Sequence, residues 1–502
     1  MQASAGCRCL PTRGIDMKHL VLILLLNCIP TIALASTPIW QQASEYPDRV
    51  ILNPTQLPSE SFSVNWRTSE EVEITVAQIA PVTSAARFDL GAKTYKAKTQ
   101  RAELRRGNSI PSNVHEQSRD NVNQERAQYH YNTHLADAAY HEVTFKNLKP
   151  NTRYAYRVRG GLGKWSEWYM TKTAGLPSSS TTRFLYFSDA QNGMREQFPA
   201  LLRKGFKAMP DADFALYTGD LVDHGARDLE WAQWFSAGQF IHAEIPVVPV
   251  VGNHEYAHQH LTDGGKQWVL SRFWQDQFKL PTSPELSNQL QETAYTLHYP
   301  NTDVFIVNTE IRHNETAFAM QTKWLRQSLS ESKAKWKIIA FHHPIFSNCG
   351  MPLNSPGQDE PAVRSALLPL ITEFNVDLVL QGHDHAYSRG SIKSEQGTRV
   401  NSVFVTASSS PKAYPLKKTR WDEYEEFNVT LERVGENTPT YQAIKVHENT
   451  LSYRSYTLTG ELYDAFDITK TQPGNVMTYP YDLMKERLFS NTEPYKHHNS
   501  LY

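Results

Sequence analysis

The sequence predicts two domains, a small all-β sandwich followed by a larger α/β domain with mixed sheets flanked by helices. The chain has 502 residues, which is more than one domain usually holds. Its first part alternates apolar and polar residues in short segments, as antiparallel strands with one solvated face do. From about residue 182 on, short apolar runs alternate with helix-like stretches, which is typical of α/β domains.

Composition and charge exclude several classes of protein. Hydrophobic residues make up 40% of the chain and charged residues 21%, which is typical of a folded globular protein rather than a disordered one. The formal net charge is -1, so the chain lacks the basic signature of a nucleic-acid-binding protein. Composition leaves the oligomeric state open.

Residues 1–35 are predicted to be an export signal. Met17-Lys18-His19 precedes an apolar run at 20–26, and Ala33-Leu34-Ala35 forms a cleavage site. Asn27 ends the apolar run well short of the roughly 20 residues that a membrane span needs, which favours cleavage over anchoring. We therefore expect a secreted or periplasmic mature chain without a membrane span. Because the pattern starts at Met17, the residues before it are consistent with a misassigned start.

The predicted sandwich covers residues 46–174. In residues 61–66 the apolar side chains, including Phe62 and Trp66, fall on one face and the polar ones on the other. Residues 71–76 repeat this alternation. Two such segments in close succession predict an antiparallel sheet with one face in water.

A further alternating segment follows the turn at Pro150 and carries Tyr154. It resembles the fibronectin type III sandwich, in which such a tyrosine lies at the corner between the sheets. The polar stretch at about 85–137 is predicted to be an insertion or a long loop. Trp165 and Trp168 would suit carbohydrate or partner binding, but a spacer domain or a wall of the active-site cleft is the favoured interpretation.

A linker at 174–181 separates the sandwich from the predicted α/β domain at 182–468, and a C-terminal tail follows at 469–502. Helix-like stretches at 321–331 and 360–374 lie between the predicted strands. Those strands are the short apolar runs at 183–187, 214–217, 247–251, 304–307, 338–341, 376–380 and 403–405.

Five of these predicted strands end in side chains that commonly bind metals. The carboxyl ends of parallel strands lie along one edge of an open α/β sheet, so residues far apart in sequence can meet there. The candidate site residues are Asp189, Asp220, Asn253, His254, His342, His383 and His385.

The types of these side chains indicate the chemistry. Carboxylate, imidazole and amide oxygen together suit Zn, Mn or Fe rather than a metal that prefers thiolates. Two cations about 3.5 to 4 Å apart repel each other, and a bridging carboxylate with a bridging hydroxide lets them share a site. Phosphate-ester hydrolysis uses such pairs to stabilise the attacking and the leaving oxygen. Side chains of these types could therefore hold a pair of metal ions.

Three motifs, Gly219-Asp220, Gly252-Asn253-His254-Glu255 and Gly382-His383-Asp384-His385, resemble the signature of the calcineurin-like metallophosphoesterases. With the sandwich in front, the chain is similar to the purple acid phosphatases and their bacterial relatives over about 47–470. The metal ligands that this resemblance implies are a bridging Asp220, Asp189 and His385 for the first metal, and Asn253, His342 and His383 for the second.

The resemblance also implies a role for the neighbouring His254. Its imidazole would protonate the leaving alkoxide or steady the phosphoryl oxygens, because the pKa of histidine lies near working pH. Glu255 is expected to orient His254.

Some positions depart from the family pattern. The broader family has histidine where this chain has Gln191, and purple acid phosphatases have a metal-bound tyrosine where this chain has Asp223. Either residue is a candidate for an extra ligand, and the identity of the first metal is open. His343 is expected to touch substrate, to contact a metal ligand without binding the metal itself, or to lie on the surface. Purple acid phosphatases carry a further substrate-facing histidine, whereas none lies between His343 and His383, which leaves the preference for monoesters open.

The function predicted from these residues is hydrolysis of phosphate esters, most like an acid phosphatase monoesterase, by a metal-bridging hydroxide. Its partner would be a small phosphate-ester substrate. A phosphodiesterase or nucleotidase with the same centre is the alternative. A non-catalytic exported binding protein ranks lower, because every ligand named above is present.

Overall fold

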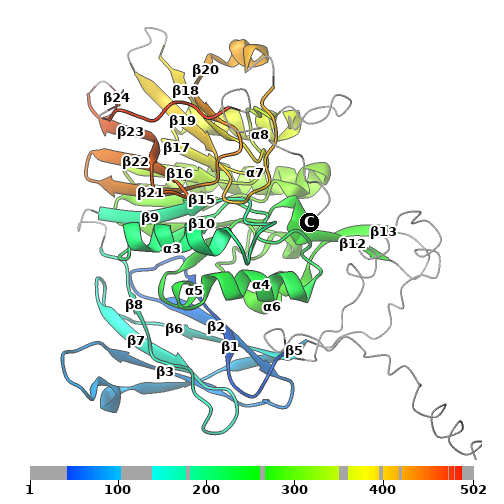
Figure 1. Cartoon of the computed structure of the whole chain (residues 1–502), viewed down its shortest axis with the longest axis vertical. Coiled ribbons are helices and arrows are strands. Elements are labelled where there is room, and N and C mark those ends of the chain that lie inside the picture. The colour runs from blue at the N-terminus through cyan, green and yellow to red at the C-terminus, as the bar shows by residue number, and fades with distance from the viewer. Residues whose placement is uncertain are drawn as a thin grey trace, which may run out of the picture. The chain divides into compact units, whose positions relative to one another are not determined.

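The structure is a computed structural model that describes residues 42–102, 138–176, 181–260, 266–349, 360–394, 399–417, 421–472, 474–479 and 481–488 (Figure 1). The predicted export signal and residues 103–137 of the predicted insertion lie outside the described residues. Among the helices in the described ranges, none is long and apolar enough to cross a membrane.

The N-terminal domain consists of two four-stranded antiparallel sheets that enclose one apolar core (Figure 1). Trp66, Phe145 and Tyr156 are fully buried in this core, and the backbone N–H of Lys149 donates a hydrogen bond of 2.9 Å to the hydroxyl of Tyr154. One sheet has the order β1 (Asp48–Pro54), β2 (Phe62–Ser69), β6 (Ala138–Phe145) and β5 (Lys98–Ala102), and the other β4 (Lys93–Lys96), β3 (Val76–Pro81), β7 (Arg153–Val158) and β8 (Tyr169–Lys172).

Two expectations for this domain were wrong. Residues 71–75 form no strand, and Ile74 is exposed, because β3 uses the next alternation at Val76–Pro81, where Ala77 and Ile79 point into the core. The second face of β2 is not in water either. Its polar residues are buried, because β1 and β2 pack against helices of the second domain.

An ion-pair network joins the two domains at this face. The guanidinium of Arg49 lies 2.6 Å from Asp228, and that of Arg67 lies 3.5 Å from Asp228 and 2.7 Å from Asp48. The side chains of both arginines and of Asp228 are almost completely buried. The hydroxyl of Tyr156 also donates to the backbone carbonyl of Ala243 in the second domain.

The second domain is built on a mixed sheet of fourteen strands in the described part of the chain (Figure 1). Its order is β11-β10-β9-β21-β22-β23-β24-β19-β17-β16-β15-β14, with β18 paired to β19 and β20. The strands are β9 (Thr181–Phe187), β10 (Phe214–Tyr217), β11 (Val247–Pro249), β14 (Tyr295–Tyr299), β15 (Thr302–Ile306), β16 (Trp336–Ala340), β17 (Leu378–Gln381), β18 (Tyr387–Lys393), β19 (Val400–Thr406), β20 (Val429–Gly435), β21 (Thr440–His447), β22 (Thr450–Thr457), β23 (Leu462–Lys470) and β24 (Asn475–Thr478).

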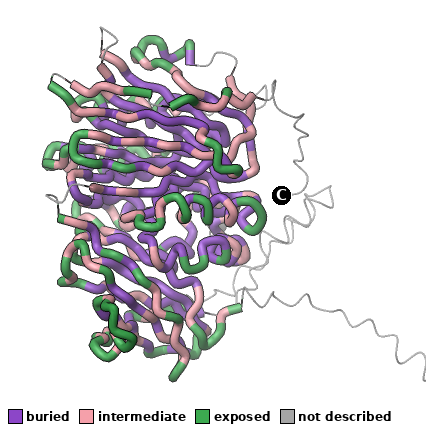
Figure 2. Tube along the Cα trace, turned by 60° about the vertical axis from the view of Figure 1, so that its left-hand side comes forward, coloured by how far each residue is buried: buried purple, intermediate pink, exposed green. Residues whose placement is uncertain are grey.

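The two ends of this sheet share one core. Leu185 of β9, Val248 of β11, Ile338 of β16 and Leu380 of β17 belong to the same buried cluster, so the sheet curls until its two halves face each other. Figure 2 shows this continuous buried band along the strands. The helices are α3 (Phe198–Ala208), α4 (Asp228–Gly238), α5 (Phe240–Glu244), α6 (Arg272–Gln277), α7 (Glu315–Glu331) and α8 (Pro361–Glu373).

The predicted architecture, an all-β domain followed by an α/β domain of mixed strands flanked by helices, is confirmed. All seven apolar runs contain strands, and the helix-like stretches correspond to α7 and α8. A hairpin of β12 (Tyr256–His260) and β13 (Lys266–Leu270) projects from the domain directly after the 3₁₀ turn Asn253–Glu255 (Figure 1). Residues 475–478 of the predicted tail form β24, which pairs with β19 and β23.

Candidate metal centre

The loops that follow β9, β10, β11, β16 and β17 meet in space. Backbone hydrogen bonds tie them together, since the N–H of Asp189 donates to Gly219 (3.1 Å) and the N–H of Gly382 donates to His342 (2.9 Å). These loops bring together all of the candidate site residues, namely Asp189, Asp220, Asn253, His254, His342, His383 and His385.

One group of donor atoms surrounds the amide oxygen of Asn253. Its Oδ1 lies 3.1 Å from Nε2 of His342 and 3.1 Å from Nδ1 of His383, and these two nitrogens are 3.2 Å apart. Oδ1 of Asp220 lies 3.4 Å from Nε2 of His342. Four potential ligand atoms therefore lie close enough to share one cation.

The second group lies on the other side of the Asp220 carboxylate. Donor atoms of Asp189, Asp220 and His385 lie within 4.8 Å of one another, and Nε2 of His385 is 3.7 Å from Oδ1 of Asp189. The side chain of Gln191 completes this group, with its Nε2 3.1 Å from Oδ2 of Asp220. Asp220 thus presents one oxygen to each group, which is the geometry of a bridging ligand.

Hydrogen bonds to the backbone fix the orientation of these side chains. Nδ1 of His342 donates to the carbonyl of Thr218 at 2.8 Å, which leaves the lone pair of Nε2 directed at the site. Both carboxylate oxygens of Asp189 accept from the N–H of His383, at 2.9 and 3.0 Å. The site is therefore pre-organised by its own loops.

The backbone of these loops is unusual. Gly219 has a φ of +95°, and a Cβ there would collide with the ring of His342. Four of the candidate site residues, none of them glycine, also adopt positive φ angles, between 48° and 75°, a region that L residues rarely occupy. They are Asp189, Asp220, His383 and His385.

The charges of the buried side chains favour the binding of additional positive charge. Burial raises the pKa of the Asp189 carboxyl to about 7, and the nearby Asp220 raises it too. Burial alone would lower the pKa of His342, but Asp220 and Asp189 together raise it to about 10. A cluster that draws a proton onto a fully buried imidazole would be stabilised by bound cations.

Two buried polar atoms without hydrogen-bond partners among the described residues also favour a metal site. Oε1 of Gln191 and Nδ1 of His385 are buried polar atoms with no hydrogen-bond partner among the described residues. Burial lowers the pKa of His383 and of His385 well below the ordinary value, so both rings are neutral and able to bind metal. The donor set therefore fits metal ions of the Zn, Mn or Fe type.

His254 stands beside this group with its side chain a quarter exposed. Its Nδ1 donates to the carbonyl of Asp223 at 2.5 Å, and its Nε2 lies 3.8 Å from Oδ2 of Asp220. Burial lowers the pKa of His254, but Asp220 and Asp223 raise it more, so the net shift is upward. The ring can therefore present a proton from Nε2 to the site.

The expectation that Glu255 orients His254 was wrong. The buried carboxylate of Glu255 instead accepts hydrogen bonds from the backbone N–H groups of Asp220 (3.0 Å), Leu221 (2.8 Å) and Gly252 (2.8 Å). It holds the loop after β10 against the loop after β11. The carbonyl of Asp223 is the group that orients the ring of His254.

The structure also shows the surroundings of Asp223 and His343, whose roles the sequence left open. The carboxylate of Asp223 faces His224 at 3.2 Å and His254 at 3.5 Å, away from the Asp189–His385 group to which Gln191 belongs. His343 is fully buried rather than on the surface. Its Nδ1 lies 2.9 Å from the hydroxyl of Thr309, and the centre of its ring lies 4.6 Å from that of the His383 ring, with the two rings tilted by 50°.

Lys412 and Tyr414, which belong to the loop after β19, were not predicted as site residues. The ring of Tyr414 lies 5.0 Å from the ring of His385, and Nζ of Lys412 lies 5.4 Å from the Tyr414 ring. No motif marks these residues. The one indication in the sequence is that both residues follow a predicted strand, the apolar run at 403–405, as the candidate site residues follow theirs.

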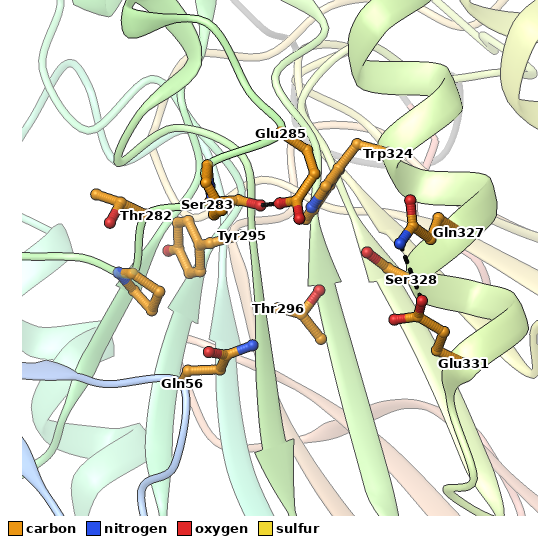
Figure 3. A pocket seen from close by; sticks show the side chains of 12 residues that line it. Gln56, Thr282, Ser283, Glu285, Tyr295, Thr296, Trp324, Gln327, Ser328 and Glu331 are labelled. Carbon is orange, nitrogen blue, oxygen red and sulfur yellow. Dashed lines mark hydrogen bonds between the residues drawn. The ribbon is translucent and has the colours of Figure 1, made fainter.

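A pocket of about 240 Å³ has none of the candidate site residues in its lining (Figure 3). Its lining includes the carboxylates of Glu285 and Glu331 and the aromatic rings of Tyr295 and Trp324, but no lysine or arginine. The two carboxylates already accept hydrogen bonds from Ser283 and Gln327. A phosphate group would be repelled there.

Comparisons with known proteins match both domains of the chain. A model described as calcineurin-like phosphoesterase matches residues 182–387, and a model described as the purple acid phosphatase N-terminal domain matches residues 47–173. Purple acid phosphatase 23 of Arabidopsis thaliana is 22% identical over 275 residues, which cover 50% of this chain and 57% of that protein. Phosphoenolpyruvate phosphatase of Allium cepa is 21% identical over 324 residues, with 61% of each covered. The chain thus spans less than two thirds of these relatives.

Solved structures show the same fold. The purple acid phosphatase PPD1 from seeds of yellow lupin, Lupinus luteus, superposes with a TM-score of 0.62 at 17% identity and covers 84% of this chain and 74% of its own. The structure of PhoD superposes with a TM-score of 0.59 at 14% identity, and the match covers 88% of this chain and 94% of the PhoD chain.

Proposed function

The chain belongs to the calcineurin-like metallophosphoesterases that carry a purple acid phosphatase N-terminal domain, and we propose from this premise that it hydrolyses phosphate esters at a dinuclear metal centre. The family comprises hydrolases of phosphate esters. A single observation supports the dinuclear centre most strongly. The carboxylate of Asp220 lies between two clusters of donor atoms, with Oδ1 3.4 Å from His342 and Oδ2 3.1 Å from Gln191.

In this proposal Asp220 would be shared between two metals. Asp189 and His385 would hold the first, and Asn253, His342 and His383 would hold the second. When bound, two ions of Fe, Zn or Mn would supply Lewis acidity for the phosphoryl oxygens and lower the pKa of water.

The residues of the chain supply orientation and the proton. His254 is held through Nδ1 by the carbonyl of Asp223, so its Nε2 carries the proton that the leaving oxygen needs. A water oxygen forms the new bond to phosphorus as the bond from phosphorus to the leaving oxygen breaks. The proton of His254 then passes to that oxygen, and the products are an alcohol and a phosphate. Monoesters of the acid phosphatase type are the proposed substrates, and diesters the alternative.

The proposed place of action follows from the predicted export signal at 1–35, which would deliver the mature chain to the periplasm or the medium. N-terminal sequencing of the secreted protein would test this. A mature chain that begins near Ser36 is expected.

The function is tested by measuring metal content and turnover together. The purified protein is expected to hold about two metal ions per chain and to hydrolyse 4-nitrophenyl phosphate or its bis ester. Asn253→Ala should lose metal and turnover, because the substitution removes the oxygen shared with His342 and His383. Asn288→Ala, at an exposed asparagine outside the centre, is the matched control. Turnover unchanged by Asn253→Ala would contradict the proposal.

A further inference from the structure

The loop at 407–417, which follows β19, is held firmly over the metal-ligand cluster. The N–H of Ser409 donates to the carbonyl of Ser188 at 2.7 Å, next to Asp189. The N–H of Tyr414 donates to the carbonyl of His385 at 3.3 Å. This loop is therefore fixed to two of the ligand-bearing loops, and its side chains keep a defined place relative to the centre.

Lys412 is the cation that this loop brings to the site. Its side chain is partly buried, packs over the ring of Tyr414 at 5.4 Å, and forms no ion pair with any carboxylate in the described part of the chain. Burial lowers the pKa of Lys412, but Tyr414 and the carboxylates of Asp220 and Asp223 raise it more, so the ammonium stays charged. The ring of Tyr414, over which this ammonium lies, is itself 5.0 Å from the ring of His385, so Lys412 is one side chain removed from the first metal group.

The neighbouring Lys417 shows what a structural lysine in this loop looks like. Its Nζ lies 2.7 Å from the carboxylate of Glu423 and 3.3 Å from the hydroxyl of Tyr424, so its charge is already neutralised by an ion pair within the protein. Lys412 has no such carboxylate partner among the residues that the structure describes. A partly buried ammonium without an ion pair, separated from the metal-ligand cluster by one side chain, is suited to meet the charge of an incoming anion.

We propose that Lys412 binds a terminal oxygen of the substrate's phosphoryl group and thereby makes the centre prefer phosphate monoesters over diesters. This inference rests on the function proposed above. A monoester dianion carries one more negative charge and one more terminal oxygen than a diester. An ammonium at this position stabilises that extra oxygen, whereas in a diester the same place holds an esterified, uncharged oxygen.

The test compares Lys412→Met and Lys412→Arg with Lys417→Met as the control. For each protein, kcat/KM is measured on 4-nitrophenyl phosphate and on bis(4-nitrophenyl) phosphate, together with metal content and the Kd of inorganic phosphate. Lys412→Met is expected to lower kcat/KM for the monoester about 10- to 100-fold and that for the diester less than about threefold, with metal content unchanged. It should weaken phosphate binding to a similar degree. Lys412→Arg should keep most of the monoester activity.

The outcomes separate the two proposals. If the wild type hydrolyses esters but Lys412→Met leaves both the ratio of monoester to diester and the phosphate Kd unchanged, the role of Lys412 is overturned and the metallophosphoesterase function stands. If the metal-loaded wild type hydrolyses neither ester, the proposed function fails, and the phosphate Kd alone decides whether Lys412 binds the anion. An equal loss in Lys417→Met would show a structural effect of the loop and would also overturn the inference.

Discussion

The side-chain amide nitrogen of Gln191 lies 2.8 Å from Nε2 of His385. An amide nitrogen can only donate, so His385 accepts with the lone pair that it would otherwise give to a metal. Oε1 of Gln191, on the other side of the amide, is buried and has no partner among the described residues. A half-turn of the amide would free the lone pair of His385 and bring Oε1 into the first metal group.

Gln191 is therefore predicted to be a ligand of the first metal. Gln191→Leu should weaken the binding of one of the two ions about 10- to 100-fold, whereas Gln191→His should retain it, because imidazole also suits these metals. The measurement is metal stoichiometry after dialysis against graded chelator. A Leu variant that keeps both ions as tightly as the wild type would show that the amide only fills space.

His254 is predicted to act on the leaving group without holding metal. His254→Gln should lower kcat about 10²- to 10⁴-fold on alkyl phosphates while metal content stays the same. The loss should be smaller for 4-nitrophenyl phosphate, because nitrophenolate leaves without needing a proton. Rates of the two substrate types, measured beside His313→Gln at an exposed histidine, check this. Equal losses on both substrates would argue against proton donation.

Asp228 is predicted to hold the two domains together. Asp228→Ala removes the carboxylate that pairs with the buried guanidinium of Arg49 among the described residues, and one of the carboxylates beside Arg67, which should cost about 3 to 5 kcal/mol of unfolding free energy. Denaturant titration checks the loss. Glu373→Ala, which breaks the exposed pair with Arg326, should cost less than about 1 kcal/mol. The same small loss in both variants would contradict the prediction.

His242 is predicted to make the protein less stable in acid. Its ring is fully buried between Trp234 and the hydroxyl of Tyr217, and burial lowers its pKa to about 3, whereas an unfolded histidine titrates near ~6.5. Between these values only the unfolded chain binds the proton, so stability is complete above ~6.5 and falls as pH decreases toward about 3. From pH ~7.5 to ~5 the loss should be about 2 kcal/mol.

The control for this pH effect is His242→Phe, which removes the titrating group. The variant has its own stability, but the drop between the two pH values should be smaller than in the wild type. Denaturant titrations of both proteins at each pH measure the difference. Identical drops would place the acid sensitivity elsewhere.

Much of the fold and the candidate site followed from the sequence because both depend on local pattern. Asp189, Asp220 and His383 each lie two or three residues beyond the end of a short apolar run, and short runs of that kind form buried parallel strands. The position of a ligand at the end of such a strand can therefore be predicted from the residues alone. The domain order is predictable for the same reason, since the period of the apolar pattern changes at the linker.

The remaining features depend on contacts that no local pattern encodes. Lys412 resembles any loop lysine until hydrogen bonds to Ser188 and His385 place its loop over the centre. The polar face of β2 has the composition of a solvated face, and only the packing of β1 and β2 together against α4 to α6 buries it. Glu255 follows His254 in sequence, but its carboxylate is used by backbone N–H groups of another loop.

The four left-handed backbone conformations at Asp189, Asp220, His383 and His385 limit how this centre can be transplanted. Each costs an L residue on the order of 1 kcal/mol, which the surrounding loops must supply. If only the side chains were copied onto turns without positive φ angles, the same donor atoms would be present but would not converge on one site. The transferable unit is the set of bent loops together with the carboxylate of Glu255 that braces them, rather than the ligand residues alone.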